Sequence, residues 1–248
     1  MMGKAVHTMQ GFVQKMLVVM LLVLVSHQAW SASDKLKLII DSDPGIDDAL
    51  ALTLALQYPG FEIMGITTTF GNADLEQATQ NALRIIELSG QSIPVYKGAN
   101  KPLVVEADTP ADIMHGEDGL GNTHLPIPIG HAESLPAAQF LVDMARQYPG
   151  QITLVALGRL TNLAQAIKQD PNFARNIQQV VLVGGTLHAS GNISPVAEAN
   201  IAGDPHAADI VFTAPWQVSM VGLDVSTKVR VDDKMLTRIK ARNQRFGE

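Results

Sequence analysis

The chain has 248 residues, of which 46% are hydrophobic, and it carries a formal charge of −6 and no cysteine. Its length and apolar content suffice for one sizeable domain with a substantial core. The acidic balance argues against a nucleic-acid partner, because phosphate binding needs a basic face, and the lack of cysteine excludes thiol nucleophiles, disulfides and thiolate metal ligands.

The N-terminus is typical of a secretory signal peptide. Two lysines precede an unbroken apolar run at residues 16–25, which is too short for a comfortable membrane span. Ala29 and Ser31 are small residues with the spacing of a signal-peptidase site. We therefore expect residues 1–31 to be cleaved and residues 32–248 to form the mature domain in a bacterial periplasm, with no membrane contact afterwards. An uncleaved membrane anchor is the alternative.

Strand and helix patterns alternate along the rest of the chain. In chain order the sequence predicts a strand at 36–40, a helix at 47–58, a strand at 61–69, a helix at 75–88 and a strand at 93–96; then an irregular stretch at 98–134, a helix at 137–148, a strand at 152–157, a helix at 161–168, a strand at 179–183, a helix at 204–212, a strand at 218–223 and a helix from 232 onward. A loop as long as 98–134 inside a domain is often functional.

The predicted strands are continuous apolar runs and do not alternate between polar and apolar residues. This pattern, with a helix between successive strands, predicts an α/β fold with a mostly parallel central sheet flanked by helices. In such sheets, ligands bind beyond the carboxyl ends of the strands. Polar clusters follow several of these ends, at residues 41–48 and 67–72 and after Leu157 and Gly185. One pocket can therefore collect residues that are far apart in the sequence.

The strongest signal is the acidic segment directly after the first predicted strand. Residues 41–48 place Asp41, Asp43, Asp47 and Asp48 within eight positions. Like charges this close raise one another's pKa unless a cation is present. A hard divalent cation resolves the repulsion, and Ca²⁺ suits carboxylates and backbone carbonyls. The segment therefore predicts a calcium site.

Other interpretations of this segment differ in what they explain. Asp47 and Asp48 could cap the following helix, but capping explains neither Asp41 nor Asp43. An EF-hand is excluded, because its ligand spacing and distal glutamate are absent. A phosphoryl-transfer site with Asp41 as nucleophile and Asp43 as acid/base stays open.

Five segments together resemble the inosine-uridine nucleoside ribohydrolase family. They are DSDPGIDD at 41–48, TTTFGN at 67–72, LVALGRLTN at 154–162, the stretch 183–200 with VGG, GN and PVAEAN, and VGLDV at 221–225. The likeness covers residues 36–230 in the family's order. It implies a Rossmann-like nucleoside hydrolase fold and calcium-dependent hydrolysis of the N-glycosidic bond of ribonucleosides, which gives ribose and a free purine or pyrimidine base.

The resemblance also implies roles for residues of the first segments. Asp43 would contact the calcium and accept a proton from water, Asp48 would bind the calcium through its carboxylate, and Leu157 would bind it through its backbone carbonyl. Asp47 and Asn72 would hydrogen-bond the ribose hydroxyls. From the same resemblance, Asp41 would orient its neighbours.

Residues further along the chain complete the site that the resemblance implies. Asn192, Glu198 and Asn200 would hold the rest of the sugar. His115 falls where the family places a catalytic histidine near the pocket. Read from the residues alone, the first three could be turn and cap residues, and His115 could be an ordinary surface histidine.

Family members continue past Glu248, and the further part supplies another histidine, proposed to protonate the leaving base, and another aspartate on the calcium. We therefore expect residues 32–248 to be a C-terminally truncated domain that turns over a ribonucleoside slowly or not at all. The family also forms homodimers or homotetramers. Three competing functions stay open: a non-catalytic periplasmic nucleoside- or ribose-binding protein, a metal-dependent phosphohydrolase, and a structural calcium module without a substrate.

Overall fold

The computed structural model describes residues 35–107 and 112–242. The chain from Leu36 onward forms one compact unit. The predicted signal peptide at residues 1–31 lies outside the described residues. Within the described ranges, every helix is too short or too polar to cross a lipid bilayer.

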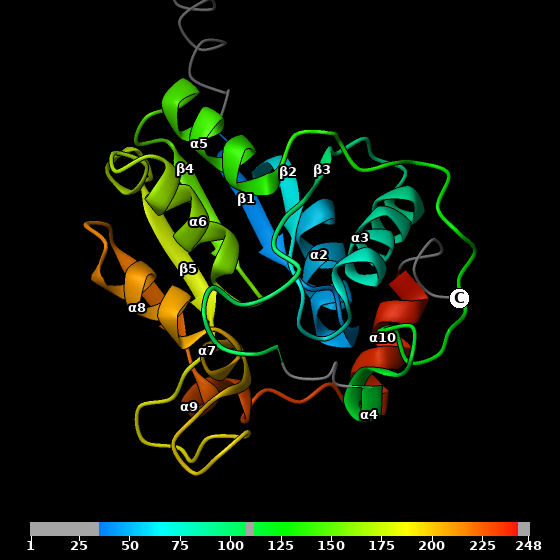
Figure 1. The fold of residues 1–248 in the computed structure, drawn as a ribbon. Coiled ribbons are helices and arrows are strands. Elements are labelled where there is room, and N and C mark those ends of the chain that lie inside the picture. The colour runs from blue at the N-terminus through cyan, green and yellow to red at the C-terminus, as the bar shows by residue number, and fades with distance from the viewer. Residues whose placement is uncertain (1–34, 108–111, 243–248) are drawn as a thin grey trace, which may run out of the picture. The chain divides into compact units, whose positions relative to one another are not determined.

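The described residues form a six-stranded sheet with helices around it (Figure 1). The strands are β1 Leu36–Ser42, β2 Phe61–Thr68, β3 Val95–Lys97, β4 Ile152–Ala156, β5 Gln179–Val183 and β6 Val218–Val221. The helices are α2 Ile46–Gln57, α3 Leu75–Ser89, α4 Asp112–His115, α5 Ala137–Gln147, α6 Thr161–Gln169, α7 Ala199–Gly203, α8 Pro205–Thr213, α9 Leu223–Ser226 and α10 Asp233–Arg242, with a 3₁₀ turn η1 at Ala174–Asn176.

The strand order is β3-β2-β1-β4-β5-β6, and each neighbouring pair in this sheet is parallel. This order is that of the Rossmann-type sheet, so the predicted α/β fold with a mostly parallel sheet is confirmed. The chain builds outward from β1 to β3 and then returns to β4 on the other side of β1. This switch point, outside the carboxyl ends of β1 and β4, is the crevice region in which such sheets bind ligands.

The core has two parts, one on each face of the sheet. Ile39 belongs to the cluster formed with α5, α6 and α8, whereas Ile40 belongs to the cluster formed with α2 and α3. Successive side chains of a strand point to opposite faces, so adjacent apolar residues in β1 fill both cores. This double burial explains why the strands are continuous apolar runs.

Helix ends follow the signals in the sequence. Asp74 caps α3 by accepting the backbone N–H of Gln77 at 2.8 Å, and Gly90 ends the helix in the left-handed conformation with φ of 70°. Asp204 caps α8 in the same way through the N–H of Ala207 at 3.0 Å. Local capping therefore fixes where these helices begin and end.

The structure differs from the predicted elements at several short segments. The strand expected at 218–223 ends at Val221, and Leu223 is the first residue of α9. The strand expected from 93 begins at Val95, directly after Pro94, which has no N–H to donate to a ladder. The short elements α4, α7, α9 and η1 were not predicted, because three to five residues give too little periodicity to recognise.

Candidate active site

The turn after β1 brings the acidic segment into the crevice. Pro44 and Gly45 separate the end of β1 from α2. A Cβ atom on Gly45 would lie 2.6 Å from His115 Nδ1 and 2.8 Å from Asn72 Nδ2. Only glycine at this position lets these two side chains approach the turn so closely.

Asp43 is held in the crevice by the main chain around it. Its side chain is buried, and its Oδ2 accepts the backbone N–H of Asn72 at 2.8 Å. A Cβ atom on Gly71 or on Gly158 would collide with the carboxylate, so both glycines form its walls. Burial raises the pKa of Asp43 well above its ordinary value, and the charge of Asp48 raises it further.

Asp48, on the first turn of α2, is the second buried acid of the crevice. Its Oδ2 accepts the N–H of Gly45 at 3.1 Å and the side-chain amide of Asn72 at 2.8 Å, and its Oδ1 accepts the hydroxyl of Ser42 at 3.2 Å. Burial, and then the charge of Asp47, raise its pKa to about 6. Asn72 therefore joins the two acids, because its backbone serves Asp43 and its side chain serves Asp48.

Asp41 lies deeper and is enclosed by polar partners. Its Oδ1 accepts the hydroxyl of Thr67 and, at 2.7 Å, the side-chain amide of Asn162. Burial raises its pKa to about 7, although these two hydrogen bonds act in the opposite direction. A carboxylate 1% exposed and held in this way disfavours the interpretation of Asp41 as a nucleophile.

Three buried oxygens at this edge of the sheet lack a hydrogen-bond partner among the described residues. They are Asp41 Oδ2, Asp43 Oδ1 and Thr69 Oγ1. Buried polar atoms in folded proteins are normally satisfied, since an unsatisfied one costs about 1–3 kcal/mol. The Asp43 oxygen in particular is placed to receive a cation or a donor from outside the chain.

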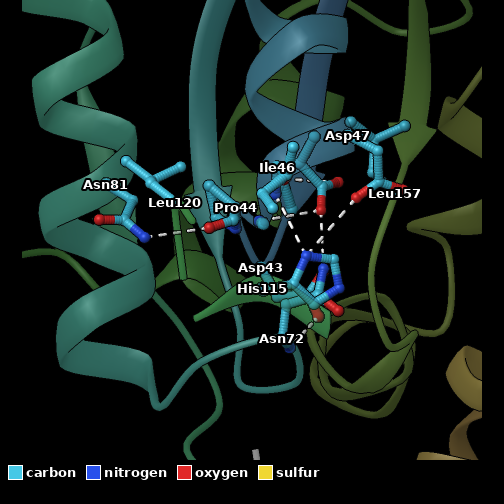
Figure 2. A network of polar contacts seen from close by, with 12 residues as sticks. Asp43, Pro44, Ile46, Asp47, Asn72, Asn81, His115, Leu120 and Leu157 are labelled. Atoms are coloured by element: carbon cyan, nitrogen blue, oxygen red, sulfur yellow. Dashed lines mark hydrogen bonds and ion pairs between the residues drawn. The ribbon is translucent and has the colours of Figure 1, made fainter. Parts of the chain in front are cut away.

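Leu157 follows β4 directly and lies across the crevice from the acidic turn (Figure 2). Its N–H donates to the carbonyl of Asp41 at 2.8 Å, which continues the ladder between the two strands. Its own carbonyl accepts the side-chain amide of Asn200 at 2.8 Å, and the same amide reaches the carbonyl of Val183 at 3.0 Å. Asn200 thus links the ends of β4 and β5 beside the crevice.

Asp47 and His115 lie at the mouth of the crevice. The side chain of Asp47 is 82% exposed, and its Oδ1 lies 4.0 Å from His115 Nδ1. The same imidazole nitrogen accepts the backbone N–H of Ile46 at 3.2 Å (Figure 2). His115 comes from the 98–134 stretch, and the fold brings it to the N-terminus of α2, while its catalytic role stays a prediction.

Glu198 and Asn192 make hydrogen bonds within the segment after β5. Glu198 is buried, and its Oε2 accepts the N–H of Gly185 at 2.8 Å and of Ile201 at 3.1 Å, so it caps α7. Asn192 is exposed, and its Oδ1 accepts the N–H of Ala199 at 2.9 Å. Both residues therefore have the turn and cap contacts considered for them, and their contact with a sugar stays a prediction.

Two residues near the acids had no individual role in the sequence prediction. Arg159 is buried, its guanidinium carbon lies 4.5 Å from the centre of the Phe70 ring, and its charge lowers the pKa of Asp43 against the larger effect of burial. Asn162 donates to Asp41 and to the carbonyl of Thr68, and accepts the N–H of Ala99 at 2.7 Å. Their place directly after β4 was the signal that could have identified them.

The residues predicted to hold a metal ion offer two carboxylates and one backbone carbonyl. Within the described parts of the chain, no three or more His, Asp or Glu side chains gather closely enough to hold an ion. The predicted set is of another kind, since it combines the carboxylates of Asp43 and Asp48 with the backbone carbonyl of Leu157. These are the oxygen donors that calcium prefers.

Comparisons with known proteins show the family that this chain resembles. Residues 38–248 match the sequence model described as inosine-uridine preferring nucleoside hydrolase. The chain is 47% identical over 205 residues to the probable uridine nucleosidase 1 of Oryza sativa subsp. japonica, covering 82% of this chain and 63% of that protein. It is 42% identical over 207 residues to the inosine-uridine preferring nucleoside hydrolase of Leishmania major, covering 82% and 65%.

Solved structures give the same result. A plant nucleoside hydrolase has a TM-score of 0.81 at 42% identity, with 85% of this chain and 67% of that one covered. The purine-preferring ribonucleoside hydrolase from Gardnerella vaginalis has a TM-score of 0.79 at 38% identity, with coverage of 83% and 66%. The chain spans less than two thirds of the length of the curated relatives named above.

Proposed function

Because this chain belongs to the inosine-uridine preferring nucleoside hydrolase family, we propose that it hydrolyses the N-glycosidic bond of ribonucleosides. Water adds its hydroxyl to the anomeric carbon of the ribose, and its proton ends on the released purine or pyrimidine base. The observation that carries the proposal is the pair of buried acids, Asp43 and Asp48, joined by Asn72 at the switch point of the sheet.

The proposal includes a calcium ion held by Asp43, Asp48 and the carbonyl of Leu157. Two observations support this set: Asp43 Oδ1 is buried without a partner in the described chain, and the pKa of both acids is raised, by burial and the charge of Asp48 for Asp43 and by burial and the charge of Asp47 for Asp48. When bound, calcium supplies the positive charge that keeps both carboxylates ionised and makes water more acidic. The residues present therefore fit the ion that the family implies.

Asp43 is the proposed general base. Its walls, Gly71 and Gly158, fix the carboxylate and leave one oxygen without a partner, so that oxygen can accept the proton of the attacking water. An oxocarbenium-like transition state develops as the bond to the base breaks, as in other glycoside hydrolyses. Ionised Asp43 also lies where a developing positive charge on the sugar is stabilised.

The polar side chains around the crevice are proposed to bind the ribose. Asp47 is exposed at the mouth and Asn72 lies between the acids, so both can meet hydroxyl groups of a sugar placed over Asp43. Asn192, Glu198 and Asn200 approach from the segment after β5. Binding energy from these contacts, together with His115 at the entrance, positions the anomeric carbon over the base.

The test is hydrolysis of uridine and inosine, measured as release of reducing sugar, with added calcium and with a chelator. Asp43→Ala is expected to lower turnover by at least about 10³-fold, because both the base and a metal ligand are lost. Asp209→Ala, which removes an exposed carboxylate on α8, serves as the matched control and retains the starting rate. Normal hydrolysis by the Asp43 variant would refute the assignment.

Export and assembly belong to the same proposal. The sequence of residues 1–31 supports secretion into a periplasm, and the family supports a homodimer or homotetramer. Fractionation of a bacterial host followed by N-terminal sequencing is expected to give a periplasmic protein that begins near residue 32. Recovery of the intact N-terminus in the membrane fraction would contradict cleavage and favour the uncleaved anchor, and recovery in the cytoplasm would contradict export.

A further inference from the structure

Asn81 is a buried polar residue on α3 with a complete set of hydrogen bonds. Its exposed fraction is 0%, and its side-chain amide donates to the carbonyl of Pro44 at 3.1 Å and to the carbonyl of Asp118 at 2.9 Å. Its Oδ1 accepts the amide of Gln77 and the guanidinium of Arg84, each at 2.9 Å. The two donated bonds leave the helix and reach two different segments of the chain.

The first of these segments is the acidic turn. Pro44 lies directly after Asp43 and before Gly45, so its carbonyl is part of the main chain that places the buried acids. Figure 2 shows the Asn81 side chain extending from α3 to this carbonyl, with Leu120 beside it. A bond to the middle of the turn restrains its height above the sheet.

The second segment is the loop of residues 115–124, which begins with His115. The carboxylate of Asp118 accepts three backbone N–H groups of this loop, from Leu120, Asn122 and His124, at 2.8–2.9 Å. The N–H of Gly121 returns to the carbonyl of His115 at 2.7 Å. These bonds close the loop on itself, so a restraint on Asp118 acts on His115 as well.

His115 has weaker restraints at its own end of the loop. Its imidazole accepts the Ile46 N–H at 3.2 Å and faces Asp47 at 4.0 Å, near solvent. Both contacts are longer than the bond from the buried Asn81 side chain to the part-buried carbonyl of Asp118, at 2.9 Å. Hydrogen bonds of buried groups are costly to break, whereas long contacts near solvent contribute less.

We infer that Asn81 is a positioning residue that fixes the His115 loop and the acidic turn at one separation, and the inference rests on the proposed function for its catalytic consequence. Asn81 touches neither the acids nor the imidazole. It acts through Pro44 on one side and through Asp118 on the other. The approach is close, since a Cβ atom on Gly119 would lie 2.8 Å from Asn81 Nδ2.

The sharpest variant is Asn81→Asp. It retains an acceptor for Gln77 and Arg84 and removes the N–H groups that reach Pro44 and Asp118. Gly119→Ala is the second variant: its Cβ would press on the same amide from the loop side, its φ of 73° adds backbone strain to the loop, and the buried helix stays unchanged. The matched control is Thr79→Val, which removes buried hydrogen bonds of the same helix, to Thr68 and to the carbonyl of Leu75, and contacts neither segment.

Hydrogen exchange of the full chain provides a readout that does not depend on activity. In Asn81→Asp and Gly119→Ala, the amides of Ile46 and Gly121 are expected to exchange at least about 10-fold faster relative to the β1 amides, because the loop and the turn separate locally. Thr79→Val is expected to leave that ratio unchanged. Equal acceleration at all amides, or the same ratio in the control, would overturn the inference.

Hydrolysis of uridine then separates this inference from the proposed function. Asn81→Asp is expected to lower kcat/KM by about 10–100-fold, as for a small misplacement of catalytic groups, and the Thr79 control by less than about 3-fold. If the hydrogen-exchange ratio rises in the two variants and not in the Thr79 control, and the wild-type chain releases no base, the link through Asn81 holds and the proposed function fails. If base is released and the exchange ratio is the same in the variants and the control, the inference about Asn81 fails and the proposed function stands.

Discussion

Two sets of carboxylates, Asp224 alone and Asp43 with Asp48, lie at the same edge of the sheet but differ in burial and in hydrogen-bond donors. Asp224, on the first turn of α9 after β6, accepts the N–H groups of Leu187, His188 and Ala189 at 2.7–2.9 Å. These bonds, that of Leu187 foremost, lower its pKa well below the ordinary value. Asp43 and Asp48 in the acidic turn are instead buried beside each other, and their pKa values are raised.

The difference separates a structural acid from acids that need an outside partner. Asp224 receives all the donors it requires from the loop after β5, and its charge stabilises that loop. Asp43 has one buried oxygen without a partner among the described residues, and the three hydrogen bonds that Asp48 accepts do not offset its burial and the charge of Asp47. A carboxylate with raised pKa and an oxygen without a partner is therefore the better candidate for binding an ion or accepting a proton.

The largest expected effect concerns calcium binding. Asp48→Asn is expected to weaken calcium binding by at least about 100-fold, because the substitution removes one of two charged ligands. Asp224→Asn is expected to leave the affinity within about 2-fold, since Asp224 is satisfied by the chain. Isothermal titration calorimetry of both variants against the wild type measures the difference. Equal weakening by the two substitutions would erase the distinction between the sets.

A second effect is a change in the sign of the pH dependence of stability. Asp41 and Asp48 have folded pKa values of about 7 and about 6, above the ordinary 3.8. In a chelator, the free energy of unfolding is therefore expected to fall as pH rises from about 4 to about 7, by several kcal/mol, since one pKa unit corresponds to about 1.4 kcal/mol.

Calcium is expected to remove this fall, because a bound cation favours the ionised acids. Asp224 acts with the opposite sign: its lowered pKa contributes stability above the ordinary value of 3.8, and the contribution is lost as pH falls below it. Denaturant unfolding between pH 3 and pH 8, with and without calcium, follows both trends. A stability that rises with pH from 4 to 7 in the chelator would contradict the raised pKa values.

The smallest expected effect is local. Asp224→Asn is expected to speed hydrogen exchange at Leu187, His188 and Ala189 by about 10–100-fold, because the charged acceptor of their N–H groups is lost. Exchange at the acidic turn is expected to stay unchanged. Asp48→Asn provides the reciprocal control, and faster exchange of residues 187–189 in that variant would mean that the two sets are coupled.

Elements with their own periodicity were predictable from the sequence. The bounds of α2, β2, α3, α5 and β5 follow to within one residue from apolar runs and from stop signals such as Gly90, and the parallel sheet follows from their alternation, whereas β1 runs two residues past the expected 36–40 and includes Asp41 and Ser42. The edge at which the polar clusters meet could be expected as well, because parallel strands end together. The acidic turn, Asn72 and Leu157 lie together at this edge, and their roles there stay predictions.

The remaining features depend on partners that are distant in the sequence. The helix α7 begins where Glu198 caps it. The helix α9 begins at Leu223, with only Gly222 between it and the end of β6. Asn81 acts on Pro44 and Asp118, each 37 positions away, and Asn162 reaches Asp41 over 121 positions. No local pattern announces which buried amide will meet which carbonyl, so these roles required the three-dimensional structure.

The glycine walls of Asp43 have a consequence for protein engineering. Gly71 and Gly158 contribute only main chain to the neighbourhood of the carboxylate, and a side chain at either position would collide with it. Substitution of Gly71 or Gly158 is therefore a poor way to alter Asp43, because any other residue adds a side chain that collides with the carboxylate. Variation at exposed positions further from the carboxylate leaves this main-chain enclosure intact.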